Sequence, residues 1–171
     1  MGRTVMQRIA NPYYVFKRRV GSTPTSSAII LLMLLASCHP VQASESFLQQ
    51  YTEIEYDGTY CKKHKSWYAY YLPLGNKIVL CKENITRTFP QSQVQKRIKS
   101  ALAHEATHLA QDCKAGIHNK QMHVLNTGIK VSKYVKARYT KDDHMIESEA
   151  WKYQSSNEPY RFVEKHCNKL N

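Results

Sequence analysis

Two short runs of aromatic and β-branched residues stand out between positions 67 and 81. The runs Trp67–Leu72 and Lys77–Cys81 flank a Pro-Leu-Gly-Asn segment. Such runs around a turn-forming segment are typical of paired strands. This pattern predicts a β-hairpin, and we expect its tyrosines to pack as a half-buried face of the sheet rather than to line a substrate cleft.

A longer segment, from about 90 to 114, follows a helical pattern. Pro90 is tolerated in a first helical turn, and Gly116 is a natural stop after the last one. Apolar residues recur between them at helical spacing: Val94, Ile98, Ala101, Leu102 and Leu109. These features predict a long amphipathic helix.

Weaker patterns surround this helix. Residues 44–58 are polar and end in a turn dipeptide, which indicates a short helix or an ordered arm. Residues 117–127 resemble a loop, and helices are expected over 129–135, from Asp142 to Gln154, and from Glu158 to the last cysteine. The chain therefore predicts an α+β domain that is mostly helical, with a small β-hairpin or sheet packed on the long helix.

The first 43 residues have the organisation of an export segment. They carry five basic and no acidic residues, with an apolar run over 28–36 that is shorter than the roughly 20 residues of a membrane-spanning helix. Val41-Gln42-Ala43 resembles a signal peptidase site, and Leu35-Ala36-Ser37-Cys38 resembles a bacterial lipobox. We expect one domain over 44–171 that is secreted or periplasmic, either free or associated with a membrane surface through a lipid on Cys38.

The net charge constrains the partners. The chain has 25 basic and 13 acidic residues, so loss of residues 1–43 leaves 20 basic residues against 13 acidic ones, a formal charge of +7. The lysines are scattered, without a dense basic run interleaved with aromatic residues. We therefore expect a solvated basic surface and no nucleic-acid partner.

Four cysteines lie beyond the export segment: Cys61, Cys81, Cys113 and Cys167. An even number of cysteines in an exported domain predicts two disulfide bonds. A zinc site made of cysteines is less favoured because the chain has no Cys-x-x-Cys pair. Four cysteines allow three pairings, and the residues themselves leave all three open.

The predicted long helix contains the sequence His104-Glu105-Ala106-Thr107-His108. Histidines four residues apart differ by about 40° around a helix, so both imidazoles can face one ion. This is the His-Glu-x-x-His arrangement of the zincins, in which zinc lowers the pKa of a bound water to about 7 and the glutamate takes its proton. The metzincin class is excluded because Gln111 and Lys114 stand where its glycine and third histidine would be.

A zinc hydrolase needs a third protein ligand, and Glu147 is the favoured candidate. On a helix it shares a face with Ala150 and Trp151, which would allow close packing and direct Glu147 towards the metal. Glu149 points about 200° away and is expected in solvent. It remains an alternative ligand, as do three histidines: His118, His123 and His144. Residues that could assist catalysis include His144, Tyr134 and Tyr153, and the sequence selects none of them.

Several segments together resemble a known family. Ile78–Cys81, Asn84, the motif His104–His108, Cys113 and the Glu147-x-x-Ala150 segment are similar to the mitochondrial ATP-synthase-assembly metallopeptidases and their bacterial minimal-gluzincin relatives. The resemblance covers residues 76–151. It departs from the family at Gln111, where aspartate is usual, and in a longer insertion before Glu147.

The resemblance implies a minimal zincin-like fold, His104, His108 and Glu147 as zinc ligands, and Glu105 as catalytic base. It also implies a Cys81–Cys113 disulfide, which leaves Cys61 for Cys167. The expected function is hydrolysis of peptide or protein substrates by an exported zinc peptidase. The alternative is a non-catalytic, zinc-held domain that acts as an assembly or binding module.

Overall fold

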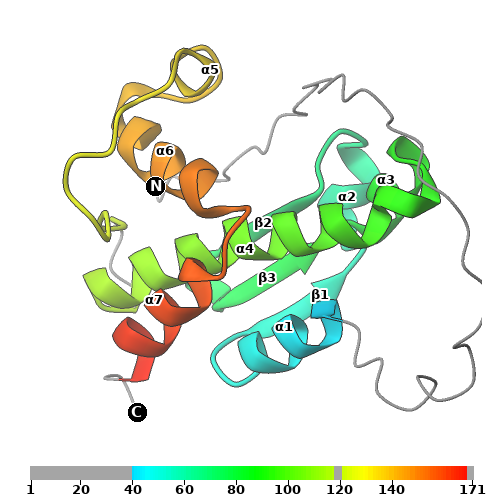
Figure 1. The fold of residues 1–171 in the computed structure, drawn as a ribbon, viewed down its shortest axis with the longest axis horizontal. Helices are drawn as coiled ribbons and strands as arrows, with labels where there is room; N and C mark the ends of the chain where they lie inside the picture. Colours follow the sequence, from blue (N-terminus) through cyan, green and yellow to red (C-terminus); the bar gives the residue numbers. More distant parts are fainter. Residues whose placement is uncertain (1–39, 118–120, 169–171) are drawn as a thin grey trace, which may run out of the picture.

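The computed structural model describes residues 40–117 and 121–168. Cys38 and most of the predicted export segment lie outside these ranges, as does His118. The elements, in chain order, are α1 (Pro40–Leu48), β1 (Glu53–Tyr56), α2 (Thr59–Lys63), β2 (Ala69–Leu72), η1 (Pro73–Gly75), β3 (Lys77–Leu80), α3 (Lys82–Thr88), α4 (Gln91–Ala115), α5 (Lys133–Lys136), η2 (Lys141–Asp143), α6 (His144–Tyr153) and α7 (Glu158–Cys167) (Figure 1). The fold is α+β and mostly helical, as predicted.

The three strands form a mixed sheet in the order β1-β3-β2. β2 and β3 are the two strands of the predicted hairpin, and they pair antiparallel with Tyr70 opposite Val79. The turn between them is η1, and Asn76, which follows it, has the left-handed conformation with φ of 41°. β1 pairs parallel with β3. This strand was not predicted, because it has only four residues and its partner strand lies more than 20 residues further along the chain, so the local sequence carries little strand pattern.

The two faces of the sheet belong to different clusters of buried residues. Ile78 and Leu80 face the main core with α4, whereas Val79 and Cys81 pack with Trp67 on the opposite face. Alternation along a strand explains the separation, because successive side chains point to opposite faces.

This alternation decides the disulfide pairing. Cys81 bonds to Cys61 of α2, on the face of the sheet away from α4, and Cys113 of α4 bonds to Cys167 of α7. The pairing implied by the family resemblance, Cys81 with Cys113 and Cys61 with Cys167, is therefore wrong. Cys81 and Cys113 belong to clusters on opposite faces of the sheet, so a bond between them would have to cross the sheet.

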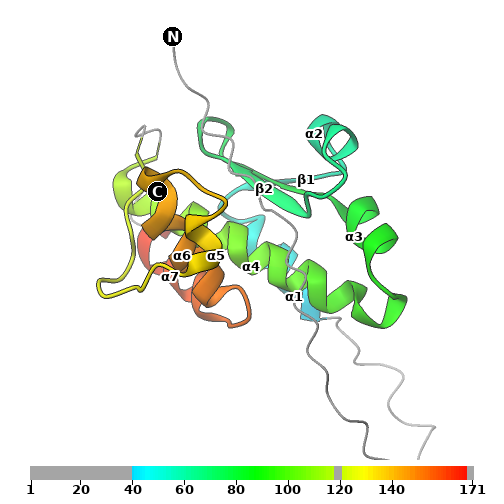
Figure 2. The same cartoon turned by 90° about the horizontal axis from the view of Figure 1, so that it is seen from above.

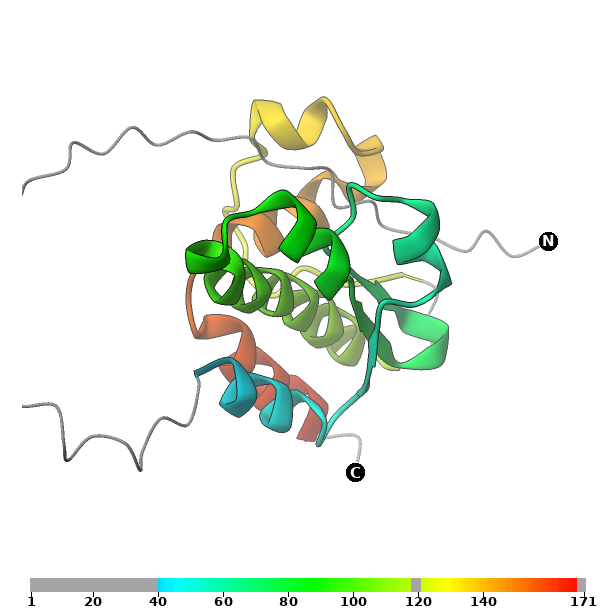
Figure 3. The same ribbon diagram turned by 90° about the vertical axis from the view of Figure 1, so that its right-hand side faces the viewer.

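Helix α4 is the central element. Figure 3 shows it surrounded by α1 and α7, by α6 and by the sheet. Between residues 91 and 100 only Val94 and Ile98 are buried, whereas every residue from 101 to 113 is buried. The predicted helix is confirmed, but only its first half is amphipathic. Its second half is enclosed on all sides, as in the core of a larger protein.

The region between α4 and α6 is less regular than predicted. The expected helix over 129–135 is wrong except for the single turn of α5, which begins after a Ser132 cap and lies beside α6 (Figure 2). The preceding segment is held by side chains from other elements instead: Lys114 donates to the Val124 and Leu125 carbonyls. The helices expected near Asp142 and Glu158 are present as α6 and α7.

The two disulfide bonds are compatible with an extracellular or periplasmic location. Among the described residues, no helix combines the length and the apolar character needed to cross a membrane.

Candidate metal centre

The structure places the two motif histidines and Glu147 at one point between α4 and α6. The Nε2 atoms of His104 and His108 lie 3.5 and 3.6 Å from the two carboxylate oxygens of Glu147. All three side chains are at most 1 % exposed. Candidate ligand atoms from these three residues lie within 4.8 Å of one another, so the group could bind a metal ion.

The separations fit a tetrahedral ion. Two ligand atoms that each lie about 2.0–2.1 Å from zinc at a tetrahedral angle are about 3.4 Å apart. Neither Nε2 atom and neither Glu147 oxygen forms a hydrogen bond to any described residue. Buried polar atoms without partners are costly, whereas coordination of a shared cation would satisfy both nitrogens and one carboxylate oxygen. Two imidazoles and a carboxylate are also a donor set that suits zinc.

Burial also sets the charge states that the ligands hold before a metal binds. It lowers the pKa of His104 to about 3 and, opposed by the nearby Glu147 carboxylate, that of His108 to about 4. Burial raises the pKa of Glu147 to about 7. Both imidazoles are therefore neutral at ordinary pH, the form that a metal requires.

A hydrogen-bond network fixes which nitrogen of His108 carries the proton. The Gln111 Nε2 atom donates to the Ile146 carbonyl and to Glu149, so its Oε1 atom faces His108 Nδ1 at 2.8 Å. Nδ1 must then donate, which leaves the Nε2 lone pair directed at Glu147. Such second-layer hydrogen bonds orient histidine ligands in known metal sites.

Glu149 is a part of this network and not a surface residue. It has no exposed surface and accepts hydrogen bonds from Gln111 Nε2 and from the backbone N–H groups of Leu125 and Asn126. The expectation that Glu149 lies in solvent is therefore wrong. The backbone at Leu125 and Asn126, in the segment before α5, binds its carboxylate.

Glu105 lies beside the predicted ligands without joining them. Its side chain is buried, and neither carboxylate oxygen forms a hydrogen bond to a described residue. Burial and the neighbouring negative charge of Glu147 raise its pKa well above the ordinary value. A second carboxylate placed in this way is unfavourable unless a cation or a proton accompanies it.

Of the described residues, none of the other proposed ligands belongs to the group that could hold a metal. His144 Nε2 contacts the Tyr139 carbonyl, and His123 is exposed. The Tyr153 hydroxyl accepts a hydrogen bond from the Asn126 amide. Of the three suggested helper residues, only Tyr134 approaches the site, where it packs against Trp151, whose ring in turn contacts His104.

Sequence reasoning missed Tyr139. Its buried hydroxyl lies beside Glu147 and Trp151. Burial and the nearby Glu147 carboxylate raise its pKa, so the phenol stays protonated. No local motif marks this residue, because it lies in the turn between α5 and η2 and reaches the site only through tertiary packing.

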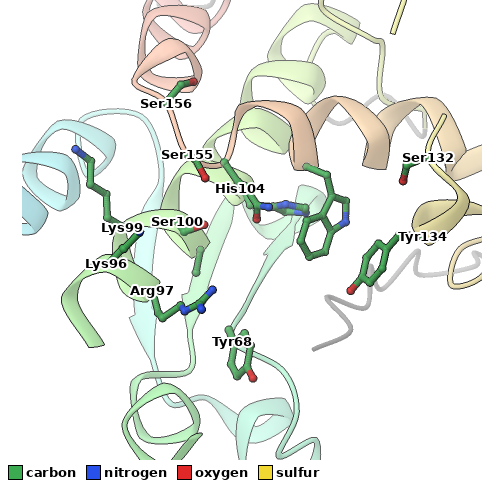
Figure 4. Close-up of a pocket in the computed structure, with 13 residues that line it drawn as sticks. Tyr68, Lys96, Arg97, Lys99, Ser100, His104, Ser132, Tyr134, Ser155 and Ser156 are labelled. Carbon is green, nitrogen blue, oxygen red and sulfur yellow. The ribbon is translucent and has the colours of Figure 1, made fainter. Parts of the chain in front are cut away.

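A cavity of about 530 Å³ adjoins His104. Tyr68, Tyr134 and Trp151 contribute aromatic surface, and Lys96, Arg97 and Lys99 contribute positive charge. Figure 4 shows the Arg97 guanidinium and the Tyr134 hydroxyl pointing into the space in front of His104. No Asp or Glu from the described residues lines this cavity.

The fold and the site define a small, disulfide-bonded α+β domain with a buried His-His-Glu group that could bind a metal ion. The chain belongs to the family described as a domain of unknown function (DUF8637), which matches residues 44–167. No curated protein and no solved structure matches the chain. The likeness to metallopeptidases therefore remains a resemblance carried by the motif and its spacing.

Proposed function

We propose that this protein is an exported zinc-dependent peptidase in which His104, His108 and Glu147 hold the metal and Glu105 is the general base. One observation carries the proposal: two neutral imidazole nitrogens lie 3.5 and 3.6 Å from the oxygens of one carboxylate in a buried site, and none of these atoms has a hydrogen-bond partner among the described residues. A zinc ion held there would supply Lewis acidity, which acidifies a coordinated water and polarises a substrate carbonyl.

The chain's own residues account for the remaining requirements of the reaction. Glu105 is held in the motif helix next to the ligands, and the positive charge of a dication favours its ionised form. Its carboxylate can then accept a proton from water and return it to the leaving amine. Burial excludes bulk water from this exchange.

We infer that Tyr139 assists the same reaction. A protonated phenol next to the Glu147 carboxylate can donate a hydrogen bond to the oxygen that becomes negative as water attacks the carbonyl. Tyr139→Phe should lower kcat about a hundredfold while the metal content stays unchanged. A variant with wild-type kcat would remove Tyr139 from the reaction.

A second function is favoured by a different observation. Glu105, His108 and Glu147 have no exposed surface, which is typical of a metal that stabilises a fold. The ion would then join α4 to α6 without catalysis. The cavity at His104 favours the peptidase, because it gives a substrate a route to one ligand of the site.

Replacement of the base separates the two functions. Glu105→Gln should retain the metal and lower cleavage of a broad peptide mixture by at least about a thousandfold, measured by mass spectrometry of the products. Glu164→Gln is the matched control, since it makes the same change at an exposed position on α7. Undiminished cleavage by Glu105→Gln would end the proposal, and a metal-loaded wild type that cleaves nothing would favour the structural role.

A further inference from the structure

The cavity beside His104 contains a cation without a matching anion. Arg97 lies over the Phe89 ring, with its Cζ atom 4.4 Å from the ring centroid, and its Nε atom is buried without a hydrogen-bond partner among the described residues. No carboxylate from those residues forms an ion pair with Arg97, Lys96 or Lys99. The guanidinium is therefore held in place at a cavity and has its remaining donors available.

Unpaired cations in a partly enclosed space favour an anionic ligand. Field lines concentrate in a cleft with walls of low dielectric constant, and here all three charged residues on the wall are positive. A guanidinium offers a planar pair of N–H donors that matches a carboxylate. Lys96 and Lys99 also line the cavity, so they add attraction at longer range while Arg97 supplies the directed contact.

The position of Arg97 on α4 gives the distance to the proposed reaction site. Arg97 precedes His104 by seven residues, which is two helical turns on the same face and about 10 Å along the axis. An extended peptide covers about 3.3 Å per residue, so this distance corresponds to about three residues. Tyr68, Tyr134 and Trp151 line the same cavity, and their rings suit an apolar side chain.

We propose that this cavity is a specificity subsite for acidic peptides. It accepts an Asp or Glu side chain of the substrate two or three residues from the cleaved bond, and Arg97 is the residue that selects it. This inference rests on the proposed peptidase function, which it deepens by giving a substrate class. The net positive charge of the protein also favours acidic substrates, because it attracts acidic peptides from solution.

The test measures binding separately from cleavage. Two fluorescently labelled peptides, which differ only in carrying Glu or Gln three residues from a central Phe, are titrated against the zinc-loaded Glu105→Gln variant. We expect the Glu peptide to bind about tenfold more tightly, and we expect salt to weaken only that peptide. Adding Arg97→Gln should reduce the preference to less than about twofold, and Arg97→Lys should leave an intermediate value.

Lys165→Gln is the control, because it removes an exposed positive charge from α7 at a residue that does not line the cavity. Lys99→Gln should reduce the preference for the Glu peptide less than Arg97→Gln does. This variant still tests the subsite if loss of the contact with Phe89 unfolds the Arg97 variants. Equal binding of the two peptides, or an unchanged preference in Arg97→Gln, would overturn the subsite.

Cleavage by the wild type separates this inference from the proposed function. Cleavage sites in a peptide mixture should be enriched in Asp or Glu at two or three residues from the cut bond. Charge-selective binding without any cleavage would contradict the peptidase and leave the subsite intact. Cleavage without a charge preference would contradict the subsite alone.

Discussion

The two halves of α4 differ in what surrounds them. From residue 91 to 100 the helix is mostly exposed and buries only Val94 and Ile98, whereas residues 101–113 are enclosed by the sheet and by other helices. The exposed half carries Lys96, Arg97 and Lys99, which can remain charged in water. The enclosed half also carries polar residues, and these need partners inside the protein.

The polar residues of the enclosed half fall into two groups. Thr107 donates to the Ala103 carbonyl, Gln111 contacts His108 and Glu149, and Asp112 accepts a hydrogen bond from Tyr71. His104 and Glu105 have no hydrogen-bond partner among the described residues. Buried polar side chains are therefore common along this helix. What distinguishes His104 and Glu105 is that their side chains have no hydrogen-bond partner among the described residues.

The largest expected effect tests the enclosed packing. Leu109 is fully buried in the main core, so Leu109→Ala should lower the free energy of unfolding by about 2–5 kcal/mol. Gln95→Ala, in the exposed half of the same helix, should change it by less than about 0.5 kcal/mol. Urea unfolding of both variants in the same metal-free buffer measures the difference, and equal stabilities would show that the two halves are not packed differently.

A smaller effect is expected from replacing Gln111, the residue that orients His108. Gln111→Ala should weaken zinc binding about 10- to 100-fold, because Nδ1 loses its acceptor and the imidazole is no longer held with Nε2 towards Glu147. Competition with a zinc-binding dye gives the affinity. Gln95→Ala again serves as the control for loss of a glutamine side chain, and an unchanged affinity in Gln111→Ala would mean that the network does not position the ligand.

The parts of the fold that the sequence predicted are those with a local signal. The hairpin follows from two runs and a turn, and α4 follows from apolar residues at helical spacing. The convergence of His104 and His108 depends only on the geometry of one helical turn. Glu147 was found because small and aromatic neighbours on its helix indicated the buried face.

The parts that were missed depend on contacts between distant segments. The disulfide pairing follows from which face of β3 carries Cys81, and the role of Glu149 follows from the irregular segment 121–132 that covers it. Tyr139 reaches the site through the turn before α6. In each case the decisive neighbour is far away in the chain, so no local pattern identifies it.

Metal analysis of three purified proteins tests the central claim most directly. Elemental analysis of the protein after dialysis against trace zinc should find about one zinc ion per chain in the wild type. Glu149→Gln should retain the ion, and Glu147→Ala should lose it, because Glu147 is the carboxylate that faces both histidines in the part of the chain that the structure describes. A wild type without zinc, or a Glu147→Ala variant that still holds one ion per chain, would contradict the proposed site.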